Sequence, residues 1–304
     1  MNVLVTGITG SVGSRLAWRL KRDGHEVRGF SRRRDLASVG VPVICGDAVT
    51  GEGLERALDG IEVAYFLIHS MEPSLEAPFP ARERRAAENF ARSARAAGVR
   101  RVIYLGGLQP DSRSVSPHLH SRLEVERILL EAAPCAVALR ASIVIGARSR
   151  SFRFLVRLVE RMPVLAIPAW RNNRTAPIDE RDMLELLARA AVNDSVCGEV
   201  LDAGGPEVVT YGELIERIRD LMLVDRPALQ FKRLTVTPIA SRLSALVAGE
   251  DHELIGPLMA SLDGDLLARD GRAAQLLGVR LHSLDAAIER ALREWEAVEP
   301  LAAR

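Results

Sequence analysis

Short apolar runs alternate with longer amphipathic stretches over the first half of the chain. The apolar runs predict strands at residues 2–5, 26–30, 41–45, 63–68, 102–105 and 137–139. The amphipathic stretches predict helices at residues 11–22, 81–97 and 116–132. Short apolar strands that alternate with helices are typical of a parallel sheet that is buried on both faces. The pattern therefore predicts the fold class α/β, with a Rossmann-type doubly wound parallel sheet.

The pattern becomes less regular after Gly146. We expect helices at residues 152–161, 179–192, 210–223 and 283–298, and strands at residues 164–170 and 199–203. Thr210 and Glu213 have the spacing of a capping box at the start of one of these helices. We therefore expect residues 1–146 to form the dinucleotide-binding core. Residues 147–304 would complete the sheet and form a smaller C-terminal substrate-binding lobe that is integrated with the core.

Glycines recur with G-x-x-G-x-x-G spacing directly after the first predicted strand. Gly7 allows a tight turn, Gly10 lets the backbone approach a pyrophosphate, and Gly13 lets the helix pack closely on the strand. The free N–H groups at the start of the following helix would then face the phosphates. The alternative interpretation is a tight strand-to-helix turn without a ligand. We expect the segment to bind a dinucleotide through Gly7, Thr9, Gly10, Ser11, Val12 and Gly13.

The end of the second predicted strand indicates which dinucleotide binds. An NAD site usually has an acidic residue there for the ribose 2'-hydroxyl, whereas an NADP site has an arginine for the 2'-phosphate. Ser31, Arg32 and Arg33 occupy this position, and a carboxylate follows only at Asp35. Guanidinium groups bind phosphate in a bidentate manner. We therefore expect NADP(H) rather than NAD(H), with a solvated basic loop as the alternative interpretation.

Gly46, Asp47 and Ala48 follow the third predicted strand. In a doubly wound sheet, Asp47 and Ala48 would lie beside the adenine, and the Asp47 carboxylate could accept a hydrogen bond from the adenine amino group. Asp47 could instead cap a helix. Both interpretations remain open on the sequence alone.

Composition limits the class of partner. The 41 basic residues nearly balance the 40 acidic ones, so the net charge of +1 gives no electrostatic signature of nucleic-acid or anionic-lipid binding. No apolar run has the length of a transmembrane helix, and the N-terminus lacks the pattern of a signal peptide. Cys45, Cys135 and Cys197 are scattered without Cys-x-x-Cys spacing. We therefore expect reduced cysteines, a cytoplasmic location, no metal site, and neither a membrane nor a nucleic-acid partner.

Several motifs are similar to those of a known superfamily. They are the glycine loop at residues 6–13, the Gly46-Asp47 pair, and residues 64–71, 103–107 and 139–146. In these motifs the chain resembles the atypical short-chain dehydrogenase/reductase superfamily, in particular the bacterial NmrA-like NAD(P)-binding proteins, over nearly its whole length. The resemblance implies a nicotinamide above the ends of the fourth, fifth and sixth strands. The residues there would be Leu67, Ile68, His69, Leu105, Gly106, Gly107, Arg122, Ala141, Ser142 and Ile143.

The chain departs from this superfamily at the reactive residues. A standard member has a serine or threonine after the fifth strand and a Tyr-x-x-x-Lys on the next helix, where the lysine lowers the pKa of the tyrosine. The matching positions here are Gly106 or Gly107, His118 and Arg122, and no Tyr-x-x-x-Lys occurs anywhere in the sequence. Arg122 could keep the ribose-binding and electrostatic role of the lysine. Carbonyl reduction by the standard triad is therefore not expected.

An enzyme with substituted chemistry is the favoured hypothesis. NADPH would supply hydride to a small organic substrate that contains an enone, a quinone or a carbonyl group, and another residue or water would donate the proton. His69 and His118 are the first candidates, because imidazole titrates near neutral pH. Tyr65 and His120 are further options. Each histidine could instead be a hydrogen-bonded structural residue, and Tyr65 could belong to the core.

Two other hypotheses remain open. The protein could sense NADP(H) or tether a partner, or the nucleotide could only stabilise the fold in an assembly role. An apolar pocket closed by the second lobe over the nicotinamide would favour an enzyme. Its expected wall residues are Arg148, Phe152, Phe154, Trp170 and Arg171, although the stripe that contains Phe152 and Phe154 could be ordinary helix core.

Overall fold

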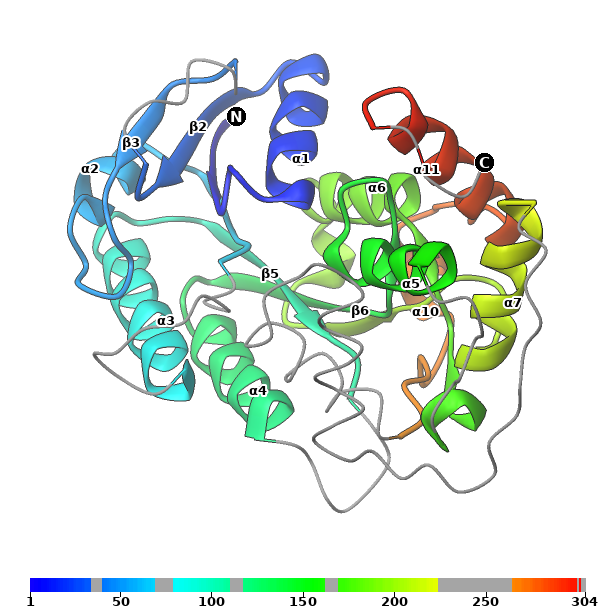
Figure 1. Ribbon diagram of the computed structural model, residues 1–304. Helices are drawn as coiled ribbons and strands as arrows, with labels where there is room; N and C mark the ends of the chain where they lie inside the picture. Colours follow the sequence, from blue (N-terminus) through cyan, green and yellow to red (C-terminus); the bar gives the residue numbers. More distant parts are fainter. Residues whose placement is uncertain are drawn as a thin grey trace.

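A computed structural model describes residues 1–33, 40–68, 79–109, 117–161, 169–223, 264–299 and 301. At its centre is a seven-stranded parallel sheet with the order β10-β6-β5-β4-β1-β2-β3 (Figure 1). The strands are β1 (Asn2–Thr6), β2 (Glu26–Ser31), β3 (Val43–Cys45), β4 (Val63–Phe66), β5 (Arg101–Gly107), β6 (Cys135–Ala141) and β10 (Val200–Ala203). The strand order reverses between β1 and β4, which is the switch point of a doubly wound sheet. The predicted Rossmann-type fold is confirmed.

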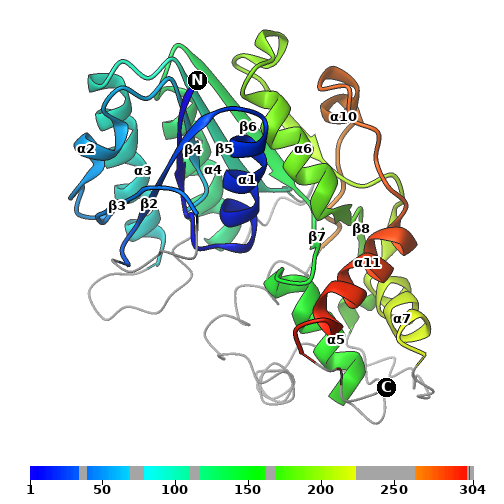
Figure 2. The ribbon, with the colours of Figure 1, turned by 90° about the horizontal axis from the view of Figure 1, so that it is seen from above.

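Helices cover both faces of this sheet (Figure 2). Alternate residues of β5 point to opposite faces, so Ile103 joins one apolar cluster and Tyr104 joins the other. The first cluster lies under α1 (Ser11–Arg22) and α6 (Glu180–Ala190), and the second lies under α2 (Leu54–Leu58), α3 (Phe79–Ala96) and α4 (Pro117–Leu130).

The second half of the chain adds a lobe beside the sheet (Figure 2). Its main helices share an apolar cluster that includes Phe152, Trp170 and Trp295. Those helices are α5 (Arg150–Arg161), α7 (Tyr211–Leu221) and α11 (Leu284–Glu296). Short strands form two further pairs: β7 (Val144–Ile145), which follows the core, pairs with β9 (Ile178–Asp179), and β8 (Arg174–Thr175) pairs with β11 (Val209–Thr210) within the second half of the chain. The remaining short elements are η2 (Ala169–Asn172), η3 (Asp194–Val196) and α10 (Arg272–Leu276).

Helix α7 begins with the expected capping box. The Thr210 hydroxyl accepts the Glu213 N–H at 3.1 Å, and the Glu213 carboxylate accepts the Thr210 N–H at 2.7 Å. The strand expected at residues 164–170 is wrong at its end, where η2 forms instead. There Trp170 turns into the lobe core, and its ring packs edge-on against Tyr211 with the centroids 5.8 Å apart. Residues 164–168 lie outside the described residues.

Cys135 and Cys197 form a disulfide, so the expectation of reduced cysteines is wrong for this pair. Cys135 begins β6, and Cys197 lies shortly before β10, the parallel neighbour of β6. The two Cα atoms are 4.9 Å apart, which is a separation that a disulfide spans. The cysteines are 62 residues apart in the sequence, so only the pairing of the two strands brings them together. Cys45 is free.

Within the described ranges, no helix combines the length and the hydrophobicity needed to cross a bilayer. The same residues contain no group of three or more His, Cys, Asp or Glu side chains arranged to hold a metal ion.

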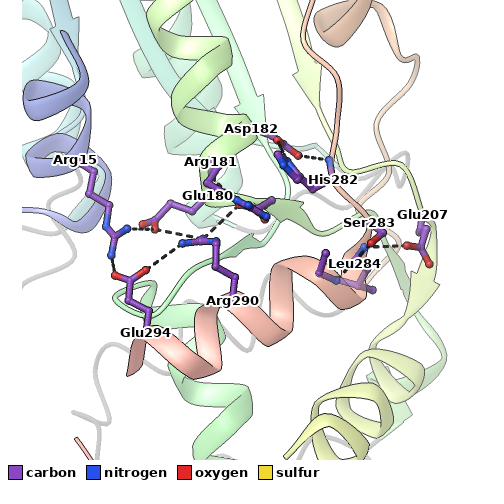
Figure 3. Close-up of polar contacts among 12 residues, drawn as sticks. Arg15, Glu180, Arg181, Asp182, Glu207, His282, Ser283, Leu284, Arg290 and Glu294 are labelled. Atoms are coloured by element: carbon purple, nitrogen blue, oxygen red, sulfur yellow. Dashed lines mark hydrogen bonds and ion pairs between the residues drawn. The ribbon is translucent and has the colours of Figure 1, made fainter. Parts of the chain in front are cut away.

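A polar network joins α11 to the helices of the core (Figure 3). Arg15 of α1 forms ion pairs with Glu180 of α6, at 3.1 Å, and with Glu294 of α11. Arg290 of α11 pairs with Glu294 at 3.0 Å and with Asp179 at 3.3 Å. Glu180 is 1% exposed, and its burial raises the pKa of its carboxyl group. These charges fix the lobe directly to the helix that follows the glycine loop.

Candidate functional site

The glycine loop joins β1 to α1 with a backbone that other residues would not allow. Gly7 has a φ of +65°, and a Cβ atom there would lie 2.6 Å from the Leu67 carbonyl oxygen. A Cβ atom at Gly13 would overlap the Gly7 carbonyl oxygen. The Gly10 N–H donates to that carbonyl at 2.9 Å, and no described side chain caps the start of α1. The first N–H groups of α1 therefore remain available to a phosphate.

Thr6 fixes this loop against the end of β4. Its hydroxyl donates to the Tyr65 carbonyl oxygen at 2.9 Å and accepts the Leu67 N–H at 3.1 Å. Thr6 is fully buried, so both hydrogen bonds are shielded from water. The loop and the end of β4 are consequently held in one fixed arrangement.

Tyr65 is a core residue, and its prediction as a proton donor is wrong. Its side chain is 0% exposed and lies in the apolar cluster beneath α1 and α6. Its hydroxyl donates to the Leu187 carbonyl oxygen at 2.9 Å. Burial also raises the pKa of the phenol well above its usual range. The alternation of β4 directs this side chain to a helix-covered face, so the core interpretation holds.

A cavity of about 650 Å³ runs across the carboxyl ends of the strands and reaches the lobe. The structure brings nearly all the residues predicted to bind the cofactor together around it. These residues are Gly7, Thr9, Gly10, Ser11, Val12, Ser31, Arg32, Arg33, Asp47, Ala48, Leu67, Ile68, Leu105, Gly106, Gly107, Arg122, Ala141, Ser142 and Ile143. Gly13 is buried behind the loop, and His69 lies outside the described residues.

The end of the cavity beside β2 is basic. β2 ends at Ser31, whose hydroxyl accepts the Arg33 N–H at 3.1 Å. Arg32 and Arg33 are exposed, and both line the cavity. Guanidinium groups at this position suit the binding of a phosphate monoester. Residues 34–39 lie outside the described residues.

Asp47 stabilises a turn rather than a helix. Its carboxylate accepts the Val49 N–H at 2.8 Å, whereas the next helix, α2, has Gly53 at its N-cap. The helix-capping interpretation is therefore wrong. Asp47 and Ala48 line the cavity, and their contact with an adenine stays a prediction.

Arg122 of α4 lines the cavity and forms an ion pair with a residue of α3. It is 7% exposed, and its guanidinium lies 3.6 Å from the Glu83 carboxylate. The Ser121 hydroxyl donates to the same carboxylate at 2.9 Å. Glu83 is 4% exposed, and it was not among the residues predicted for the site. Its helical spacing from the buried Ala87 and Phe90 on α3 was the available signal for a buried, paired charge.

The two glycines at the position of the superfamily's serine have different surroundings. A Cβ atom at Gly106 would lie 2.9 Å from the Tyr104 ring, whereas one at Gly107 would have no neighbour within 4 Å. Tyr104 is 2% exposed, and burial raises the pKa of its phenol to about 12, an effect that the nearby Arg122 charge opposes. Gly106 thus makes room for a buried ring, while Gly107 lies at the cavity with space for a side chain.

The histidine candidates are described to different extents. His118 lies in the first turn of α4, one turn before Arg122, and its side chain is outside the described part of the structure. His69 is outside it entirely. His120 is exposed on α4 and is not among the residues that line the cavity. Proton transfer by His69 or His118 stays a prediction.

A group of hydroxyls lies where the sheet meets the lobe. The hydroxyl oxygens of Ser142, after β6, and Thr175, in β8, are 3.0 Å apart. Tyr211, at the start of α7, lines the same cavity, and its buried hydroxyl has no hydrogen-bond partner among the described residues. Burial raises the pKa of this phenol to about 12, so it remains protonated at neutral pH. Ser142 was predicted as a site residue, but Thr175 and Tyr211 were not. These two reach the site because β8 pairs with β11, a pairing between segments far apart in the sequence.

Only some of the expected wall residues line the cavity. Arg148 and Phe154 do so. Phe152 and Trp170 are 0% and 3% exposed and belong to the lobe core, and Arg171 is not among the lining residues. The expectation is therefore wrong for Phe152 and Trp170, whose side chains pack inside the lobe core, and for Arg171, which does not line the cavity. Phe154 also belongs to the lobe core, although it lines the cavity.

Residues 7–143 match the protein family described as NAD(P)H-binding. Over 187 residues, the chain is 30% identical to the ceramide reductase of Caulobacter vibrioides, and the match covers 59% of this chain and 57% of that relative. The chain thus spans little more than half the length of that relative. Over 252 residues, it is 27% identical to the (4-alkanoyl-5-oxo-2,5-dihydrofuran-3-yl)methyl phosphate reductase of Streptomyces griseus, with 80% of each chain covered.

Solved structures share the fold over nearly the whole chain. MoeE5 in complex with UDP-glucose and NAD has a TM-score of 0.71 at 21% identity, covering 98% of this chain and 99% of that one. The UDP-glucuronic acid 4-epimerase from Bacillus cereus, in complex with UDP-glucuronic acid and NAD, has a TM-score of 0.72 at 18% identity, covering 98% and 100%. At these identities the likeness shows the fold alone.

Proposed function

Because the chain carries an NAD(P)H-binding domain with the fold of the short-chain dehydrogenase/reductase superfamily, we propose that it is an NADP(H)-dependent reductase of the atypical type. Its substrate would be a small organic molecule with an enone, quinone or carbonyl group. The observation that carries this proposal is the single cavity that connects the glycine loop to Arg122 and to the hydroxyls beside the lobe. Phosphate-binding groups and proton-donating groups thereby share one site.

The residues around the cavity fit a dinucleotide. The first N–H groups of α1 suit the pyrophosphate, because the N-cap is a glycine and no side chain of the described residues caps the helix. Arg32 and Arg33 would bind a 2'-phosphate, which favours NADP(H) over NAD(H). Arg122 would bind the nicotinamide ribose, and its ion pair with Glu83 would keep the guanidinium in place.

NADPH, when bound, would supply the hydride. The Ser142 hydroxyl would donate a hydrogen bond to the substrate oxygen. Thr175, next to Ser142, and Tyr211, which lines the same cavity, would be further hydrogen-bond donors. A hydroxyl both donates and accepts, so Thr175 would orient the Ser142 hydroxyl, and water in the cavity would supply the proton that the reduced product takes up. His69 and His118 remain the alternative proton donors.

The name of the Streptomyces griseus relative gives the first substrate class to test. It describes a dihydrofuran ring that carries an oxo and an alkanoyl group, and such a ring double bond conjugated with carbonyl groups is an enone. An enone presents one carbon to a hydride and one oxygen to a hydrogen-bond donor. We therefore place enones before quinones and ketones.

The test is turnover. The protein would be incubated with NADPH and a panel of enones, quinones and ketones, and the loss of NADPH absorbance would be followed. Oxidation that saturates with substrate, and that disappears in Gly10→Asp, supports the reductase. Saturable NADPH binding without oxidation across the panel would support the alternative, a non-catalytic NADP(H)-binding sensor or assembly protein, which the lack of a Tyr-x-x-x-Lys in the sequence also favours.

A further inference from the structure

A second cavity, of about 900 Å³, lies between α1 and α6 next to the glycine loop. We call it the arginine groove, because arginines from α1, the end of β2, the lobe, α6 and the segment before α11 all line it. Its described lining includes only Asp182 and Glu185 as carboxylates. The groove is therefore strongly cationic, although the whole chain has a net charge of only +1.

Some of these arginines are neutralised by carboxylates. Figure 3 shows Arg15 between Glu180 and Glu294, at the seam between α1 and α11. The other pairs are Arg19–Glu185, Arg189–Glu185 and Arg181–Asp179. Arg15 and Arg19 join α1 to other helices, whereas the pairs of Arg181 and Arg189 are local to α6. The guanidinium groups in these pairs contribute little net charge to the groove.

Arg22, Arg33, Arg148 and Arg280 are different. All are exposed, and within the described ranges none of them has a carboxylate at ion-pair distance. Like charges that converge on a concave surface repel one another, and a bound anion relieves this repulsion. Burial lowers the pKa of Arg15, Glu180 opposes this effect, and the charges of Arg290 and of the groove residue Arg148 add to the lowering.

The shape of the groove suits a small molecule. Its volume lies within the range of about 300–1,000 Å³ that is common for such sites. The Trp18 side chain is 63% exposed in the wall, with the Arg22 guanidinium 5.0 Å from its ring centroid. His282 borders the groove and is fixed by Asp182, which accepts its backbone N–H at 2.7 Å and lies 2.5 Å from its Nδ1 (Figure 3).

We propose that the arginine groove binds a small molecule that carries phosphate groups. Guanidinium forks match phosphate oxygens, and Trp18 offers an aromatic surface to the remainder of the ligand. Thr9, Arg33 and Arg148 line both cavities, so a cofactor 2'-phosphate could reach the shared end. Arg22 lies about 12 Å further along α1 than Ser14, the first residue of this helix in the groove lining, at about 1.5 Å per residue. That distance separates the proposed site from a single phosphate at the shared end.

The experiment uses inorganic pyrophosphate as the probe and calorimetry on the full chain, with and without saturating NADPH. Pyrophosphate should bind saturably both without and with NADPH. Because Arg33 lines both cavities, NADPH should weaken this binding but not abolish it. The double variant Arg22→Ala/Arg280→Ala should weaken this binding by about tenfold or more, because charge-assisted hydrogen bonds are lost. Arg56→Ala/Arg293→Ala is the matched control, since both arginines are exposed and outside the groove.

Three results would overturn the proposal. They are the absence of saturable binding, full competition by NADPH, and equal pyrophosphate affinity in the groove variant and in the control variant. Full competition would assign the pyrophosphate to the dinucleotide cavity alone. Circular dichroism and NADPH affinity of both variants would show that they are folded. Tryptophan fluorescence gives a second readout in the wild type. Trp170 and Trp295 are only 3% and 2% exposed, so a change in fluorescence on binding would come from Trp18.

Discussion

The two ends of the main cavity are built in different ways. The phosphate end is one short segment between β1 and α1, and its binding groups are backbone N–H groups exposed by glycines. The opposite end uses side chains from separate elements: Arg122 on α4, Glu83 on α3, and Ser142 with Thr175 beside the lobe. A backbone site tolerates few substitutions because it depends on the absence of side chains. A side-chain site can exchange one donor for another while the scaffold stays the same.

The largest expected effect comes from breaking the backbone end. Gly10→Asp would place a carboxylate at the start of α1, where the phosphates are expected, and a Cβ there lies 3.2 Å from the Gly7 carbonyl oxygen. We expect NADPH affinity to fall by about three orders of magnitude, since lost N–H contacts and added charge repulsion together cost about 4 kcal/mol. Calorimetry with Gly10→Ala as the milder control measures this loss. Unchanged affinity in a folded Gly10→Asp protein would refute the phosphate-loop assignment.

The next largest effect concerns cofactor choice. Arg32→Ala combined with Arg33→Ala should weaken NADPH by about 100-fold, because each guanidinium–phosphate hydrogen bond is worth about 1.5–3 kcal/mol. NADH lacks the 2'-phosphate, so its affinity should change only a few-fold. Titration of both nucleotides against both proteins gives the ratio. Equal losses would show that these arginines are a solvated basic loop.

A smaller effect is expected at the side-chain end. Glu83→Gln removes the charge that holds Arg122 but keeps the size of the residue. We expect a loss of about 1–3 kcal/mol in the free energy of unfolding and about tenfold weaker NADPH binding. Urea unfolding and calorimetry measure the two quantities. Glu88→Gln is the control on the same helix, because Glu88 is about half exposed and its ion pair is with Arg84, which is itself exposed.

The difference between a site built from one segment and a site built from several elements explains which features could be predicted from the sequence. The loop could be predicted because one short segment contains Gly7, Gly10 and Gly13, so their spacing alone was sufficient. The sheet could be predicted because its strands appear as short apolar runs along the sequence. The contact between Thr175 and Ser142 depends on how β8 and β11 pair, which no local pattern encodes. The disulfide between Cys135 at the start of β6 and Cys197 before β10 escaped prediction for the same reason.

The smallest expected effect compares neighbouring glycines at the side-chain end. Gly106→Ser would press a side chain into the Tyr104 ring, 2.9 Å from the new Cβ, and should destabilise the fold by about 1–3 kcal/mol. Gly107→Ser meets no atom within 4 Å and should change stability by only about 0.5 kcal/mol. Thermal or urea unfolding of the two variants gives the difference directly. A Gly106→Ser effect as small as about 0.5 kcal/mol would mean that the Tyr104 ring moves aside, and that Gly106 can be replaced by the superfamily's serine.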